Sequence, residues 1–134
     1  MKFTIEKYPQ GLDNLAIITN LDEPVDYTCD FLTARDDRGY LLGAAGVNFY
    51  KLEEPRFEHI IVSPKYQKTK LGGILMKRTE RWLKDLGYKA FVAYIYNTKT
   101  LMIKYAKKFK MKPYKFTDVG TWWYKSLEEG YVLS

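Results

Sequence analysis

The sequence has one cysteine, one histidine and no long apolar run in 134 residues. A lone Cys29 excludes an internal disulfide framework and a cysteine-rich zinc site, so we expect no metal. No stretch approaches the roughly 18 to 20 apolar residues that cross a bilayer. The first ten residues, MKFTIEKYPQ, lack the apolar core of a secretory signal. With five prolines and 46% hydrophobic residues, the composition predicts a compact cytoplasmic protein without membrane contact and with one domain over residues 1–134.

Positive charge is concentrated in the second half of the chain. The net charge is +6, the segment 12–58 is neutral to acidic, and lysine dominates from Lys65 to Lys115. A basic half favours an anionic ligand, either a nucleic acid or a phosphorylated cofactor. A lysine-rich solvated face that keeps the protein soluble explains the same charge. Charge alone leaves these alternatives open.

Hydrophobic spacing predicts an α+β fold. From Leu71 the apolar residues recur at helical spacing until Gly87, which suits a helix end, and Asn97 is a good N-cap for a following helix. That helix would bury a face made of Leu101, Met102, Tyr105, Ala106 and Phe109. In chain order we expect a strand around 3–7, a helix in 11–21, strands at 26–34, 40–52 and 56–62, a helix at 71–86, a strand at 90–96, a helix after 97, and strands at 114–117 and 121–126. Hairpins followed by a β-α-β crossover imply a mixed, mostly antiparallel sheet of about six to seven strands flanked by about three helices.

The segment 62–75, VSPKYQKTKLGGIL, connects a strand to a helix and carries most of the functional signal. A helix N-terminus offers unpaired N–H groups and the positive end of a dipole, so a glycine-containing strand-loop-helix junction can bind an anion. The segment is neither GxxxxGK[ST] nor GxGxxG, which excludes the P-loop and the dinucleotide-binding fingerprint.

The same segment resembles the acetyl-coenzyme A loop of the GNAT-type N-acetyltransferases. That family's motif is [Q/R]-x-x-G-x-[G/A] after a strand ending in V-x-P-x-[Y/F], and Val62, Pro64, Tyr66, Gln67 and Gly72 are in place. Two departures stand out. Lys70 occupies the position of the first glycine, where it would either crowd a pyrophosphate or add charge to it. Lys110-Met111 replaces the family's usual Gly-Phe.

The resemblance, over about residues 26 to 126, implies a GNAT-like domain that binds acetyl-CoA as its co-substrate. It implies an N-acetyltransferase that moves the acetyl group directly to a primary amine of a protein or small molecule. The implied cofactor-binding residues lie at the end of one strand, in the loop and at the end of the next strand: Ile61, Val62, Gln67, Lys68, Thr69, Lys70, Leu71, Gly72, Gly73 and Asn97.

Such a transfer needs a base for the ammonium and an acid for the leaving thiolate. Glu58 and His59 are the candidate bases, and because neighbours on a strand face opposite ways, we expect at most one of them to point into the cleft. The resemblance favours Glu58 and matches Tyr105 to the acid. The alternatives are an ion-paired Glu58, a core His59 bonded to backbone, and a core Tyr105. Cys29 is expected to be a buried apolar residue.

A second function stays open from the sequence. A degenerate cofactor loop, a lysine-rich half and many aromatics also suit a catalytically weak module that binds RNA or a protein partner on the same fold. No signature of a nucleic-acid-binding motif favours RNA directly. The sequence leaves open the identity of the acceptor and whether the protein is a monomer or a homodimer.

Overall fold

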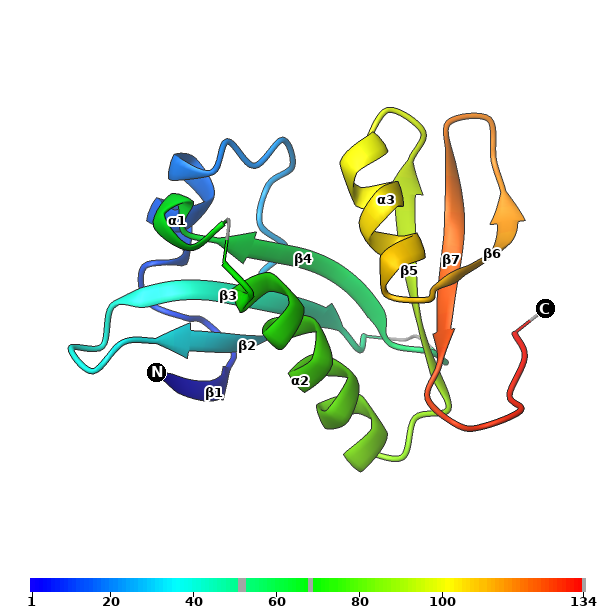
Figure 1. Ribbon diagram of the computed structural model, residues 1–134, viewed down its shortest axis with the longest axis horizontal. Coiled ribbons are helices and arrows are strands. Elements are labelled where there is room, and N and C mark those ends of the chain that lie inside the picture. Colours follow the sequence, from blue (N-terminus) through cyan, green and yellow to red (C-terminus); the bar gives the residue numbers. More distant parts are fainter. Residues whose placement is uncertain (51–52, 68, 134) are drawn as a thin grey trace.

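The computed structural model describes residues 1–50, 53–67 and 69–133. Seven strands form one sheet in the order β1-β2-β3-β4-β5-β7-β6, and every neighbouring pair is antiparallel except β4 and β5 (Figure 1). This confirms the predicted α+β fold with a mixed, mostly antiparallel sheet and three α-helices. The elements are β1 (Lys2–Glu6), α1 (Leu12–Ile18), β2 (Asp30–Arg35), β3 (Leu41–Asn48), β4 (Arg56–Val62), a 3-10 turn (Pro64–Tyr66), α2 (Leu71–Asp85), β5 (Ala90–Tyr96), α3 (Thr100–Lys108), β6 (Lys112–Phe116) and β7 (Gly120–Ser126).

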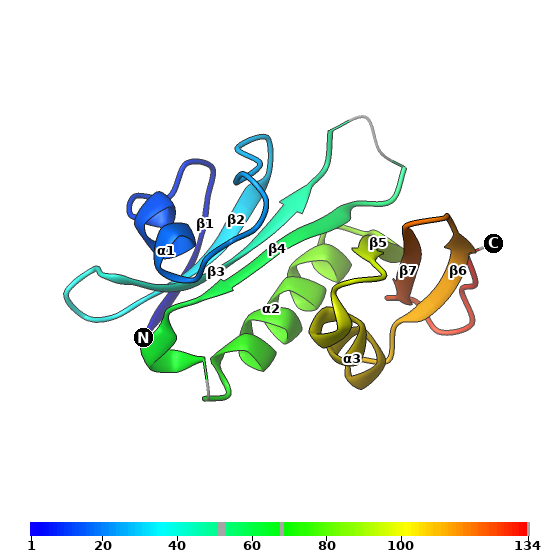
Figure 2. The ribbon, with the colours of Figure 1, turned by 90° about the horizontal axis from the view of Figure 1, so that it is seen from above.

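Helices cover both faces of the sheet, with α1 on one face and α2 and α3 on the other (Figure 2). The larger core lies on the α2 side, where Leu71, Leu75 and Leu83 are at most 2% exposed and pack with residues of β2, β3 and β5. The smaller core holds Leu12, Leu15, Phe31 and neighbours under α1. The helical spacing from Leu71 arises because one stripe of α2 must face the sheet while its lysines and arginines face solvent.

Two predicted strands have other bounds than expected. The strand predicted from residue 26 starts at Asp30, because the Asp26 side chain accepts hydrogen bonds from the backbone and hydroxyl of Thr28 and closes a turn instead. The strand predicted over 40–52 ends at Asn48, and residues 51–52 lie outside the described part of the chain. The helix predicted within 11–21 spans Leu12–Ile18.

The prediction that Asn97 caps α3 is wrong. The N-cap is Lys99, without a side-chain hydrogen bond to the helix. Asn97 is held by the β6–β7 turn, since its backbone N–H donates to the carbonyl of Val119 (2.8 Å) and its amide reaches that of Asp118. The predicted apolar face of α3 is also partly wrong, because Leu101 is 63% exposed and Tyr105 39% exposed, while Ala106 is the buried residue.

Strands β4 and β5 diverge, and this divides the sheet into two parts. Among the described residues they pair in register only at Arg56 and Val92, supported by a hydrogen bond from the Val92 N–H to the Pro55 carbonyl (3.0 Å). Figure 1 shows β4 running away from β5 beyond that point. The facing edges therefore keep backbone N–H and C=O groups that no neighbouring strand satisfies.

Candidate active site

A hollow lies where β4 and β5 separate. Its floor and walls come from four segments of the chain: the early part of the α1–β2 connection, the middle of β4, the end of β5 and the start of α3. The residues that line it are Leu21, Asp22, Glu23, Glu58, His59, Ile60, Tyr94, Ile95, Tyr96, Lys99 and Met102. Two of the three predicted catalytic residues, Glu58 and His59, therefore reach the same space.

A β-bulge explains how neighbouring residues can both line this hollow. The β3–β4 register pairs Gly46 with His59 and Val47 with Phe57, so Glu58 stands opposite no residue of β3. A bulge re-aims the side chains beside it. Glu58 and His59 both line the hollow, whereas the sequence predicted that at most one of them points into it. Burial nevertheless alternates along β4, with Glu58 half-buried and His59 buried.

His59 is tied to the backbone. It is 4% exposed, its ring stacks on that of Phe31 at 6.4 Å, and its Nε2 accepts a hydrogen bond from the Asp26 N–H (3.0 Å). Burial lowers the pKa of His59, although the carboxylates of Glu58, Glu23 and Asp26 oppose that shift. The ring is therefore neutral at pH 7, and its Nε2 lone pair is already engaged.

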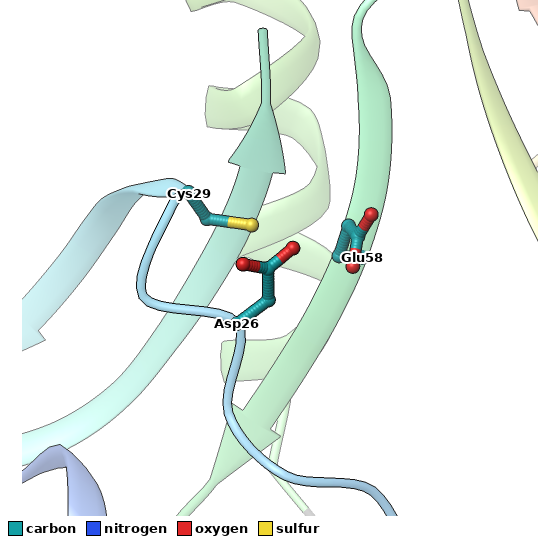
Figure 3. Close-up of side chains that lie close together, drawn as sticks. All are labelled: Asp26, Cys29 and Glu58. Atoms are coloured by element: carbon teal, nitrogen blue, oxygen red, sulfur yellow. The ribbon is translucent and has the colours of Figure 1, made fainter. Parts of the chain in front are cut away.

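Glu58 lies among charged and polar groups from two parts of the chain. The Arg56 guanidinium forms an ion pair with one of its oxygens. The Asp26 carboxylate and the Cys29 thiol approach it from the segment before β2, and the polar atoms of Asp26, Cys29 and Glu58 all lie within 4.8 Å of one another. Figure 3 shows Asp26 between the thiol and Glu58.

Cys29 belongs to this group but is not a nucleophile. It is 1% exposed, as the sequence predicted. Burial raises the pKa of the Cys29 thiol, and the neighbouring charges of Asp26 and Glu58 raise it further. The protonated thiol is a poor metal ligand and a poor attacking group, so Cys29 acts as a packed neighbour of the two carboxyls.

The β5 side of the hollow is aromatic and fixed in place. The Tyr94 hydroxyl hydrogen-bonds to Thr117 Oγ1 (2.7 Å), and its ring contacts those of Tyr96 and Trp122, with centroids 5.2 and 5.0 Å away. Among the aromatic residues of β5 and β7, Tyr94 and Tyr96 line the hollow, whereas Trp123 belongs to the core.

An ion pair links the two sides of the hollow. Lys99, at the start of α3, contacts Asp22 of the α1–β2 connection, although 77 positions separate them in the sequence. Both residues line the hollow. Sequence reasoning missed this pair and Asp26, because no local motif marks contacts between distant segments. The run of acidic residues from Asp22 to Asp30 was the only signal available.

The loop after β4 leads directly into the N-terminus of α2. Gln67 turns back to β4, its amide donating to the Val62 carbonyl (3.2 Å), and Thr69 Oγ1 accepts the Leu71 N–H (3.2 Å). The amides of Gly72 and Gly73 belong to the first helical turn, where N–H groups lack intrahelical partners. A Cβ built on Gly73 would meet nothing within 4 Å, so this helix end is open to a ligand.

The remaining predicted residues are spread more widely. The Ile61 side chain is buried under α1, so only its backbone is available to a ligand. Lys68 lies outside the described residues. Tyr105 stacks on Phe109, with ring centroids 6.1 Å apart, and is not among the residues that line the hollow. Asn97 is exposed just beyond the end of β5. Glu58 and Val62 are four strand residues apart, which separates the hollow from the loop by about 13 Å.

Comparison with known proteins gives a consistent result. A structure of a GNAT family acetyltransferase from Elizabethkingia anophelis with acetyl-CoA bound is 15% identical, with a TM-score of 0.74, and the match covers 93% of this chain and 97% of that one. The PaiA N-acetyltransferase from Thermoplasma acidophilum, in complex with coenzyme A, is 16% identical, with a TM-score of 0.72 over 94% and 99% of the two chains. Ard1 from Thermoplasma volcanium is 14% identical, with a TM-score of 0.72 over 96% and 100%.

These structural likenesses establish the fold. A search of the curated proteins finds no match. Among the described residues no helix is long and apolar enough to cross a membrane, the longest being the 15 residues of α2. The sequence model of the acetyltransferase (GNAT) family matches residues 4–111, which include the bulged strand, the loop and the whole of α3. The chain thus belongs to the GNAT family of acetyltransferases.

Proposed function

We propose that this protein transfers the acetyl group of acetyl-CoA directly to a primary amine of a protein or small molecule, with Glu58 as the proton acceptor. One observation carries the proposal: the bulge in β4 presents Glu58 to the hollow, and the same strand ends at the open N-terminus of α2. A proton acceptor and an anion site therefore lie on one strand.

The residues of the loop fit the phosphates of acetyl-CoA. The amides of Gly72 and Gly73 and the positive end of the α2 dipole favour an anion. A Cβ on Gly72 would meet only Val62 Cγ2, at 4.0 Å, so the backbone is accessible. Gln67, Thr69, Lys70 and Leu71 complete the loop, and the charge of Lys70 adds to the attraction.

The diverging edges of β4 and β5 fit the extended arm of the cofactor. Among the described residues, β4 beyond Arg56 and β5 beyond Val92 have no registered partner on their facing edges, so backbone groups on those edges can take hydrogen bonds from a ligand. An amide-containing chain supplies them in the manner of an added strand. When bound, acetyl-CoA supplies the acetyl group as a thioester, a reactive acyl donor.

Glu58 is the better placed of the two candidate bases. Nε2 of His59 already accepts the Asp26 N–H, and His59 is buried. Glu58 is half-buried and lines the hollow, so its carboxylate accepts the proton of an ammonium there, directly or through water. Tyr105 is the proposed proton donor to the leaving thiolate, although it lies outside the hollow and needs a water or a rotation of its side chain to act.

A binding module without catalysis is not favoured, because the chain belongs to a family of acetyltransferases. The acidic and aromatic walls of the hollow, Glu23 and Glu58 on one side and Tyr94 and Tyr96 on the other, suit an amine rather than the phosphates of RNA.

The proposal is tested in two steps. Calorimetry first measures binding of acetyl-CoA to the purified chain. Release of the coenzyme A thiol is then measured with a panel of amines: spermidine, lysine, and peptides with free N-termini. Glu58→Gln keeps the shape but removes proton acceptance, so turnover should fall by about 10² at neutral pH and recover partly as pH rises.

Glu53→Gln makes the same chemical change on the exposed approach to β4 and serves as the control. It should leave both binding and turnover unchanged. Absence of acetyl-CoA binding would refute the proposed function. Binding and turnover that survive Glu58→Gln unchanged, with a large loss in His59→Ala, would move the base to the histidine.

A further inference from the structure

Asp26 is held in a fixed position beside the hollow by residues of three segments. Its carboxylate accepts hydrogen bonds from the Thr28 N–H (3.0 Å) and hydroxyl (2.6 Å), and from the Asn48 side-chain amide (3.3 Å). Its own N–H donates to His59 Nε2 (3.0 Å). Asn48 is 7% exposed and His59 4%. Two buried polar side chains, those of Asn48 and His59, thus hydrogen-bond to Asp26, which is itself only partly buried. These contacts indicate that the position of the Asp26 carboxylate is important.

The carboxylate of Asp26 faces that of Glu58, which lies between two opposite charges. On one side is the Arg56 guanidinium, in an ion pair with Glu58. On the other is Asp26, whose oxygen lies within 4.8 Å of a Glu58 oxygen (Figure 3). A neighbouring cation disfavours protonation of a carboxylate, and a neighbouring anion favours it. Arg56 alone would therefore make Glu58 a weak proton acceptor.

We propose that Asp26 is a positioning residue of this site: its carboxylate offsets the Arg56 guanidinium and keeps Glu58 able to accept a proton from the acceptor amine. The inference rests on the proposed function only in giving Glu58 the role of proton acceptor. Asp26 does not line the hollow, so it acts through Glu58 and not by contact with the amine.

For this role Asp26 must be ionised. Partial burial raises the pKa of Asp26, but hydrogen bonds from the side chain and backbone of Thr28 outweigh it, so this pKa lies below its usual range. Asp26 is therefore the residue of the pair that carries a fixed negative charge at neutral pH. Glu58 is the member of the pair with free access to the hollow.

The other groups near Glu58 do not cancel this effect. The Cys29 thiol is protonated and His59 is neutral, as described above. On the facing connection, Asp22 and Lys99 pair with each other, and Glu23 adds a further negative charge to the lining. The tyrosines of β5 that line the hollow, Tyr94 and Tyr96, contact each other edge to face. Arg56 and Asp26 are thus the opposing charges closest to Glu58.

The experiment follows the Glu58 carboxyl directly in the free protein, by carbon-13 NMR of labelled glutamate, with the resonance identified by its loss in Glu58→Gln. In Asp26→Asn the titration midpoint of this carboxyl should move to lower pH by about one unit. In Arg56→Gln it should move to higher pH. In the double variant the two changes should largely cancel.

Two controls separate charge from structure. Asp26→Glu keeps the charge and should leave the midpoint near that of the wild type. Asp30→Asn removes a carboxylate at the start of β2, outside the group, and should have no effect. If the Glu58 midpoint is unmoved in Asp26→Asn while the variant remains folded, the inference is wrong. Shifts of the midpoint in the same direction for Asp26→Asn and Arg56→Gln would also overturn the inference. If Asp26→Asn does not fold, Asp26→Ser takes its place and is judged by the same criteria.

A kinetic arm uses spermidine or any other amine of the panel that is acetylated. Asp26→Asn should lower kcat/KM about tenfold at neutral pH and move the acidic limb of its pH profile to lower pH, with the affinity for acetyl-CoA unchanged. A purely structural role would lower the rate at every pH without moving the limb. Failure of acetyl-CoA binding would refute the proposed function, whereas the NMR result stands independently of turnover.

Discussion

Replacing Gly120 with alanine places a methyl group where the Tyr94 hydroxyl lies. A Cβ built on Gly120 would be 2.5 Å from Tyr94 Oη, 2.6 Å from Cζ and 2.9 Å from the Ile95 carbonyl oxygen. Carbon atoms in contact lie about 3.5 to 4.0 Å apart, so the Tyr94 ring must move by about 1 Å. The Ile95 carbonyl belongs to the backbone of the same sheet, so the new methyl group cannot avoid Tyr94 by shifting towards Ile95.

The cost follows from that geometry. Forcing an extra methyl into a packed site costs about 1–3 kcal/mol. Moving Tyr94 also strains its hydrogen bond to Thr117 Oγ1, which itself receives the Gly120 N–H (3.1 Å) and donates to the Gly120 carbonyl (3.1 Å). For a chain of this length, the loss should lower Tm by roughly 3 to 10 °C.

Thermal and urea unfolding followed by circular dichroism measure the effect. The matched control is Gly73→Ala, whose new Cβ meets nothing within 4 Å, and which should keep or slightly raise the stability because alanine favours the helix. Tyr94→Phe in the Gly120→Ala background removes the closest contact and should recover part of the loss. A Gly120→Ala variant as stable as the wild type, or strictly additive effects in the double variant, would refute the reasoning.

Three further predictions concern the site. Gly72→Asp puts a carboxylate at the proposed phosphate site and should weaken acetyl-CoA binding at least tenfold by calorimetry, about 1.4 kcal/mol; unchanged affinity in a folded variant would contradict the loop assignment. Lys70→Gly should also weaken binding, more at low salt, whereas tighter binding would show that Lys70 crowds the loop. Burial lowers the pKa of His59 below its unfolded value of about 6.5, so the unfolded chain binds the extra proton, and the free energy of unfolding should fall as pH drops from 7 towards 5. Because His59 is the only histidine, His59→Gln should make urea unfolding flat over that range.

Periodicity predicted the fold well, because the strands and α2 each bury one face and leave a repeating apolar pattern. The order of elements, the α+β fold and the position of the loop before Gly72 all follow from local signals. Where two local preferences compete, the prediction was wrong. Asp26 has a side chain that closes a turn with Thr28, and Asn97 is bound to the β6–β7 turn, and both contacts depend on geometry that the pattern does not contain.

The chemistry around Glu58 could be predicted only in part. The family resemblance indicated Glu58 itself, but the bulge arises from a mismatch between two separate strands, where Gly46 pairs with His59 and Val47 with Phe57. That mismatch leaves no mark on the alternation of burial within β4. Asp26 reaches the site across 32 positions of sequence, and only the folded chain brings it to Glu58.

Among the described residues, β4 and β5 share a single registered pair, and this has a mechanical consequence. Strands β1 to β4 form one part of the sheet, and β5, β7 and β6 form the other. Apart from the core that the two parts share under α2 and α3, the backbone pairing at Arg56 and Val92 joins them in the described part of the chain. A ligand that hydrogen-bonds to both free edges acts as a removable strand between the two parts of the sheet. Its binding free energy then adds to the cohesion of the sheet, so amide hydrogen exchange along the facing halves of β4 and β5 should slow together when such a ligand is bound.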